Sequence, residues 1–161
     1  MNKLISTFFG VGLLKPAPGT WGSLAALPLF WMTYEIAGLI GVILVGFAAF
    51  YFGWNAIKTY SHQTKRHDAS EVVIDEVVGQ FIALIPVAVG ATGMGVGTEM
   101  LWPGWIAAFV LFRAFDICKP GIIGRFDKGT TALSVMLDDV FAGLYAAIGV
   151  LILAGAFHGI G

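Results

Sequence analysis

Acidic side chains fall into short groups along this chain, and each group borders a long stretch without charge. Eight of the ten carboxylates lie in three clusters, at 68–76, 116–127 and 138–139. Two clusters contain adjacent acids, Asp75-Glu76 and Asp138-Asp139. A carboxylate beside hydrocarbon is costly unless it is paired, hydrated or bound to a metal. These acids are therefore the first candidates for a chemical role.

The clustered acids have the chemistry of ligands for Mg²⁺, which prefers carboxylate oxygens completed by water and substrate phosphate. The candidate metal ligands are Asp75, Glu76, Asp116, Asp138 and Asp139. Three of them are also candidates for a direct catalytic role: Asp75, Asp116 and Asp139. Gly79 and Gly143 follow the two acid pairs by one helical turn, and small residues let helices approach closely. The alternative is that acids at helix amino termini merely complement the helix dipole.

Basic residues accompany the second acid cluster. Arg113 precedes Asp116 by three residues and shares its helix face, so the two can pair. Lys119 precedes Pro120, which is expected to end the helix. Arginine binds phosphate oxygens through a bidentate fork, and lysine through its point charge. The candidate phosphate ligands are Arg113, Lys119 and Arg125, and Lys119 is also a catalytic candidate. For Lys119 and Arg125 the alternative is an ordinary excess of basic residues on one membrane face.

A segment rich in glycine and proline, residues 10–23, precedes the first long apolar stretch. Such a segment can form a loop whose free amides hold an anion, with Thr20 or Ser23 capping the following helix. Thr20 and Ser23 are therefore further candidate phosphate ligands. The segment lacks the Gly-Lys-Ser/Thr of a Walker loop. A simple helix start explains its composition equally well.

The composition is that of a membrane protein. The chain is 58% hydrophobic and 12% charged, with a mean hydropathy of +0.85, which lies outside the range of soluble domains. Five stretches lack charge: 16–34, 36–57, 77–98, 100–112 and 140–161. A spanning helix needs about 20 apolar residues, so the short fourth stretch must continue past Arg113, whose side chain can reach the headgroups. We therefore predict a single all-α, multi-helical integral membrane domain over residues 1–161, with about five membrane segments and an N-terminal interfacial helix at 1–14.

Five crossings place all nine lysine and arginine residues on one side. The positive-inside rule makes that side cytoplasmic, and the acid clusters lie on it. No basic surface interleaved with aromatic residues is present, so nucleic acid is not an expected partner. The single cysteine, Cys118, excludes an intrachain disulfide. His62 and His67 are five residues apart and do not share a helix face, so zinc is not expected.

Four motifs occur in order along the chain: Pro18-Gly-Thr-Trp-Gly-Ser-Leu-Ala-Ala-Leu-Pro28, Asp75-Glu76-Val-Val-Gly79, Phe112-Arg113-x-x-Asp116-x-x-Lys119-Pro120 and Met136-Leu-Asp138-Asp139-Val-x-Ala-Gly143. Together they closely resemble the phosphatidylglycerophosphatase A family. The resemblance implies a Mg²⁺-dependent enzyme of the bacterial inner membrane. Such an enzyme removes the terminal phosphate of the lipid phosphatidylglycerophosphate and leaves phosphatidylglycerol. Relative to the family pattern, Arg125 is shifted by one position.

Other functions remain open from the residues alone. In a small divalent-cation transporter the same acids would line a permeation route, but the span interiors contain none. A non-catalytic lipid-binding protein is the second alternative. For a hydrolase, attack by water and attack by an aspartate through a phospho-enzyme are both possible. No oligomeric state is predicted.

Overall fold

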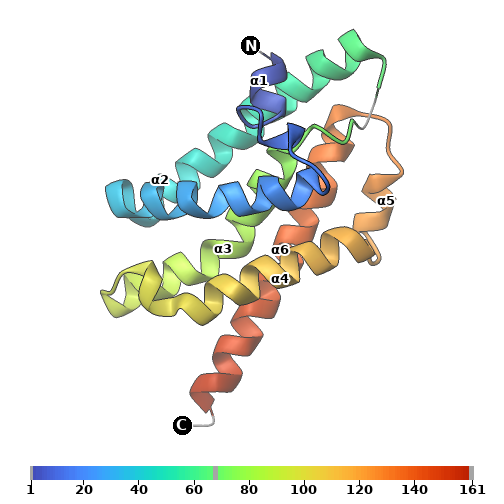
Figure 1. The fold of residues 1–161 in the computed structure, drawn as a ribbon. Coiled ribbons are helices and arrows are strands. Elements are labelled where there is room, and N and C mark those ends of the chain that lie inside the picture. Colours follow the sequence, from blue (N-terminus) through green and yellow to red (C-terminus); the bar gives the residue numbers. More distant parts are fainter. Residues whose placement is uncertain (1, 67–68, 160–161) are drawn as a thin grey trace.

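The structure of the chain is a computed structural model that describes residues 2–66 and 69–159. The secondary structure of these residues consists of helices joined by turns and loops, without a strand (Figure 1). The helices are α1 (Asn2–Ser6), α2 (Pro18–Thr64), α3 (Ile74–Met94), α4 (Trp102–Cys118), α5 (Ile123–Asp127) and α6 (Ala132–Gly159). Two 3-10 turns, η1 (Val11–Leu13) and η2 (Thr98–Leu101), precede α2 and α4. The prediction of an all-α fold is confirmed.

Four helical stretches are long and apolar enough to cross a membrane: α2, α3, η2 with α4, and α6. The most apolar window of α2 has a mean hydropathy of 2.2, yet only 17% of it is buried within the molecule. Apolar surface on this scale would aggregate in water, whereas lipid tails solvate it. The fold is therefore that of a membrane protein.

The longest helix, α2, is broken and folds back on itself at Gly38 (Figure 1). Gly38 has φ 61° and ψ −159°, a conformation that glycine adopts without the steric cost of a side chain. A straight helix of 47 residues would extend about 70 Å, more than twice the roughly 30 Å of a hydrocarbon core. The two arms of α2 correspond to the first two predicted segments, which Glu35 separates. The number of crossings stays a prediction.

The N-terminal helix is shorter than expected. The prediction of one interfacial helix over residues 1–14 is wrong, because α1 ends at Ser6. Phe8, Phe9 and Gly10 have positive φ angles of 45°, 56° and 93°, and these turn the chain. The carbonyl of Ser6 accepts a hydrogen bond of 2.9 Å from the amide of Val73. The N-terminal segment is thereby attached to the residue that precedes α3.

The ends of two helices set the positions of candidate site residues. α2 begins at Pro18, whose fixed φ suits the first turn, and Ala17 is its N-cap residue. The expectation that Thr20 or Ser23 caps this helix is therefore wrong, since both lie inside it. α4 continues past Arg113 to Cys118, as predicted. Lys119 then has φ 47°, and its amide donates a 2.8 Å hydrogen bond to the carbonyl of Phe115.

The two helices that carry the acid pairs, α3 and α6, pack against each other (Figure 1). A Cβ atom on Gly143 would lie 3.1 Å from the Cα of Gly79, and one on Gly79 would lie 2.7 Å from the carbonyl oxygen of Asp139. Carbon atoms in contact settle at about 3.5–4.0 Å, so only glycine permits this approach. As expected from their spacing, the two glycines bring the acid-bearing turns of α3 and α6 together.

Candidate active site

A polar cavity of about 330 Å³ lies where several helix ends meet. The start of α2, the first turn of α3, the end of α4, the residues around α5 and the first turns of α6 enclose it. Its charged lining residues are Asp75, Glu76, Arg113, Asp116, Lys119, Asp127, Asp138 and Asp139. Acids and bases that are distant in sequence therefore share one small volume.

Three of the predicted metal ligands converge. Carboxylate oxygens of Asp75, Glu76 and Asp139 all lie within 4.8 Å of one another. Asp75 and Asp139 are only 5% and 4% exposed. Within the described part of the chain, Oε2 of Glu76 and Oδ1 of Asp139 are buried and have no hydrogen-bond partner. Buried anionic oxygens without donors are unfavourable unless a cation neutralises them.

The three carboxylates fit a small hard cation. Mg²⁺ binds oxygens octahedrally at about 2.0–2.1 Å, which places ligand atoms roughly 3–4 Å apart. The spread of the three oxygens is close to that spacing. Few protein ligands are needed, because Mg²⁺ usually retains water and takes substrate phosphate as well. Asp75, Glu76 and Asp139 are therefore the residues suited to hold the ion.

The other two predicted ligands are bound to basic side chains. Asp116 Oδ2 lies 2.7 Å from Nη1 of Arg113, and Asp138 Oδ2 lies 3.0 Å from Nζ of Lys119. Oδ1 of Asp138 is buried, and no described residue hydrogen bonds to it. The five acids thus separate into a cluster of three and two ion pairs beside it.

Lys119 joins three elements around the cavity. Its ammonium group contacts Asp127 of α5 and Asp138 of α6 from its position at the end of α4. Burial by itself would lower the pKa of Lys119, but the hydrogen bonds and charges of Asp127 and Asp138 raise that pKa above its usual value. Lys119 is therefore a permanent cation at neutral pH, suited to binding a phosphate oxygen.

Arg113 belongs to α4, and its side chain contacts the start of α2. Its Nη1 atom also donates a 3.4 Å hydrogen bond to Oγ of Ser23, which in turn donates one of 2.9 Å to the carbonyl of Gly19. A Cβ on Gly19 would lie 3.2 Å from this Nη1 and would overlap the carboxylate of Glu76. Gly19 therefore lets the N-terminus of α2, where unpaired amides favour anions, approach the acid cluster.

Three of the five predicted phosphate ligands do not line the cavity. Thr20 and Arg125 are absent from its lining, and Arg125 is exposed on α5. Ser23 is buried and reaches the site only through Arg113. His67 and Asp68 lie outside the described residues.

The structure adds polar residues that the motif analysis missed. Ser70 lines the cavity from the loop before α3. Gln80 is fully buried, and neither amide atom has a hydrogen-bond partner among the described residues. It follows Glu76 by four residues and so lies on the same face of α3. The sequence could have indicated Gln80, because it is the one amide side chain in the apolar stretch 77–98.

Comparison with known proteins agrees with the arrangement of these motifs. The sequence model of the family described as Phosphatidylglycerophosphatase A matches residues 4–154. The chain belongs to this family. Phosphatidylglycerophosphatase A of Haemophilus influenzae is 36% identical over 146 residues, which cover 90% of this chain and 83% of the relative. The Escherichia coli K12 protein of the same name is 31% identical, with 94% and 82% covered.

A third relative carries a different name. A protein of Bacteroides thetaiotaomicron described as a putative phosphatidylinositol-3-phosphatase is 37% identical, with 90% of this chain and 88% of the relative covered. No solved structure matches the chain. All four motifs through which the chain resembles the phosphatidylglycerophosphatase A family contribute residues to the cavity. Family membership therefore agrees with the location of the site.

Proposed function

We propose that this chain hydrolyses the terminal phosphate of phosphatidylglycerophosphate in a Mg²⁺-dependent reaction at the cytoplasmic face of the bacterial inner membrane. The observation that carries the proposal is the convergence of three carboxylates within 4.8 Å, in a cavity that also contains Arg113 and Lys119. Family membership and the names of two relatives supply the lipid substrate.

The basic residues bind the phosphate of the substrate. Arg113 is oriented by its ion pair with Asp116 and its contact with Ser23, so its fork is fixed before the substrate arrives. Lys119 is held by Asp127 and Asp138. Together the two cations stabilise the charge that builds up on the phosphoryl oxygens. The first amides of α2 complete the anion site.

The acids Asp75, Glu76 and Asp139 would hold Mg²⁺, which would neutralise phosphate charge and lower the pKa of bound water. A water molecule attacks phosphorus in line with the glycerol oxygen, and the phosphorus–oxygen ester bond breaks. The attacking water gives up a proton and the glycerol oxygen gains one, so the products are inorganic phosphate and phosphatidylglycerol. Acid quenching during turnover of a substrate with a radiolabelled terminal phosphate tests this step. We expect label only in lipid and inorganic phosphate, whereas attack by an aspartate would leave hydroxylamine-sensitive label on the protein.

The decisive experiment measures phosphate release from phosphatidylglycerophosphate with and without Mg²⁺. Asp139→Asn is expected to lose about 100-fold or more of the activity, since even outer-shell metal partners are worth 10–100-fold. Glu99→Gln makes the same chemical change at an exposed acid outside the cavity and should retain wild-type activity. Unchanged activity of folded Asp139→Asn would remove the proposed site.

Two features bear on the alternative functions. Beneath the acids, Gly79 is in close contact with Gly143 and with the ring of buried Phe112. A permeation route for cations would have to cross this packed layer, which disfavours a transporter.

The third relative's name makes phosphatidylinositol 3-phosphate the natural competitor substrate. We expect a higher kcat/KM for phosphatidylglycerophosphate, and the opposite order would reassign the headgroup.

Cys118 provides a direct test of orientation. It is exposed at the end of α4, next to Lys119 at the cavity. A membrane-impermeant maleimide should label it in inverted inner-membrane vesicles and not in intact spheroplasts. Labelling from the outer side would place the site on the opposite face. The basic residues support the cytoplasmic assignment through the positive-inside rule.

A further inference from the structure

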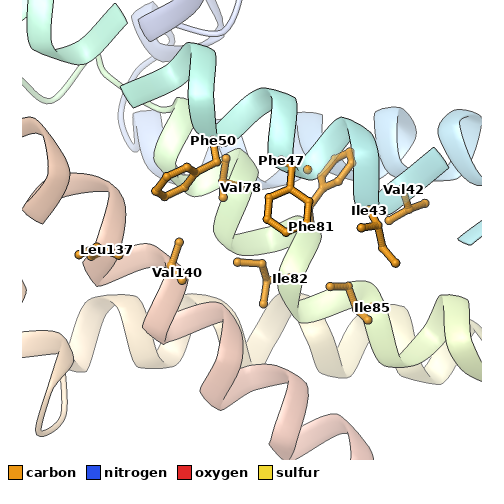
Figure 2. Close-up of a pocket in the computed structure, with 11 residues that line it drawn as sticks. Val42, Ile43, Phe47, Phe50, Val78, Phe81, Ile82, Ile85, Leu137 and Val140 are labelled. Carbon is orange, nitrogen blue, oxygen red and sulfur yellow. The ribbon is translucent and has the colours of Figure 1, made fainter. Parts of the chain in front are cut away.

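A second cavity, apolar throughout, lies between the second arm of α2, α3 and α6. Its volume is about 300 Å³, and its lining contains aliphatic and aromatic side chains together with Gly46. Figure 2 shows these side chains, with Leu137 and Val140 of α6 at one end and Val42, Ile43 and Ile85 at the other. None of the lining residues is polar or charged, so the groove offers nothing to a headgroup or an ion.

The groove begins where the polar cavity ends. On α3, Asp75 of the acid cluster precedes Val78 of the groove by three residues, so both lie on one helix face. On α6, Leu137 and Val140 of the groove flank the Asp138-Asp139 pair in sequence. The polar cavity and the apolar groove are therefore neighbours along the same two helices.

The direction of the groove matches the shape of a phospholipid. Val78, Ile82 and Ile85 follow α3 away from the acids, over about 10 Å at 1.5 Å per residue. Because α3 is a candidate membrane span, this path runs from the headgroup level into the hydrocarbon. A lipid whose phosphate lies in the polar cavity has its acyl chains pointing the same way.

The geometry points to a binding site for one acyl chain of the lipid substrate in this groove. The inference rests on the proposed function and specifies how the substrate is positioned. Lipid tails are as apolar as the groove, so moving a chain from the bilayer gains little hydrophobic free energy. The gain is in orientation: a held chain fixes the distance and angle at which the phosphate meets Arg113 and the acid cluster.

Gly46 offers a way to fill the groove without disturbing the site. A Cβ there would meet only Cδ1 of Phe81, at an ordinary 3.9 Å, so alanine fits and leucine extends into the open space. Gly46→Leu should lower kcat/KM for a dipalmitoyl phosphatidylglycerophosphate by about tenfold, because the phosphate is then misplaced. A dihexanoyl analogue is too short to need the groove. Gly46→Leu should therefore lower kcat/KM for this analogue by less than about twofold, which is too small a change to indicate a misplaced phosphate.

A control variant separates bulk from position. Leu44→Trp adds bulk at a 63% exposed position on the same helix arm outside the groove. It should retain the wild-type preference for the long-chain lipid. Equal losses on both substrates in Gly46→Leu, or the same loss in Leu44→Trp, would overturn the inference.

A measurement without turnover distinguishes this inference from the proposed function. A phosphatidylglycerophosphate with a photoreactive diazirine in one acyl chain should label Ile43, Phe47 and Ile82, and Gly46→Leu should abolish that labelling. Equal labelling of Leu44 would show that the groove holds only ordinary surrounding lipid. Cross-links between two copies of the chain through these residues would show a self-association surface instead. If wild type hydrolyses neither substrate, the proposed function fails, and the labelling still decides the groove.

Discussion

Replacing Gly143 by alanine is expected to separate α3 from α6 and to lower activity while the chain stays folded. The new Cβ would lie 3.1 Å from both the Cα and the carbonyl carbon of Gly79, and closer still to the carbonyl oxygen. All three atoms belong to the backbone and cannot swing aside. Because carbon contacts settle near 3.5–4.0 Å, the helices must move apart by roughly 0.5–1 Å.

That separation acts on the acid cluster. Asp139 lies one turn before Gly143 on α6, and Glu76 lies just before Gly79 on α3. Metal–ligand distances tolerate only about 0.2 Å, and a displacement of about 1 Å at a reacting centre costs on the order of 100-fold in rate. We therefore expect kcat/KM to fall about 100-fold, and more Mg²⁺ to be needed for half-maximal activity.

The assay is Mg²⁺-dependent phosphate release from phosphatidylglycerophosphate in detergent, with thermal unfolding to establish that each variant is folded. Overpacking is expected to cost about 1–3 kcal/mol of stability. Gly155→Ala is the matched control, since it is on the same helix and its Cβ would have no neighbour within 4 Å. It should retain activity and Mg²⁺ dependence. A folded Gly143→Ala variant with wild-type kcat/KM would refute the account of how the acids are assembled.

Three further outcomes follow from the site. Arg113→Lys should lose about tenfold or more in kcat/KM for phosphate release, since the charged hydrogen bond to Asp116 and the expected forked bond to substrate phosphate are each worth about 1.5–3 kcal/mol; full activity would remove Arg113 from the phosphate site. Because the pKa of Lys119 is raised in the folded state, its pairs stabilise the fold fully below about pH 10.4, the value in an unfolded chain. The difference in unfolding temperature between wild type and Lys119→Met should therefore persist up to that pH and shrink above it, and a difference already lost near pH 8 would contradict the pairing. Gln80→Met should unfold at an equal or higher temperature, because it removes a buried amide that has no partner among the described residues; a clearly lower temperature would indicate that the amide is satisfied by water.

Much of the site could be predicted from sequence, because its signals are local. Uncharged stretches identified the spanning helices, and Pro120 predicted the end of α4 next to Lys119. Arg113 and Asp116 pair as their spacing on one helix face indicates. The adjacent acids marked α3 and α6 as the helices that carry the chemistry. Each of these inferences needs only the helical repeat and the cost of charge in hydrocarbon.

The partition of the acids needed the tertiary structure. By sequence, Asp138 and Asp139 are equivalent neighbours, yet successive residues on a helix point about 100° apart. Asp139 therefore joins the three-acid cluster while Asp138 turns to Lys119. Arg125 also needed the tertiary structure: its basic side chain made it a candidate phosphate ligand, but its position on α5 leaves it outside the cavity.

Sequence by itself determined that this chain is an all-α membrane protein and predicted that its acids and bases lie at one level of the bilayer, because composition and spacing are properties of each segment alone. Only the tertiary structure decided which oxygens converge, that the N-terminus of α2 abuts Glu76, and that an apolar groove adjoins the acids. Those features depend on how closely helices cross, and the crossing at Gly79 and Gly143 is a relation between two distant segments.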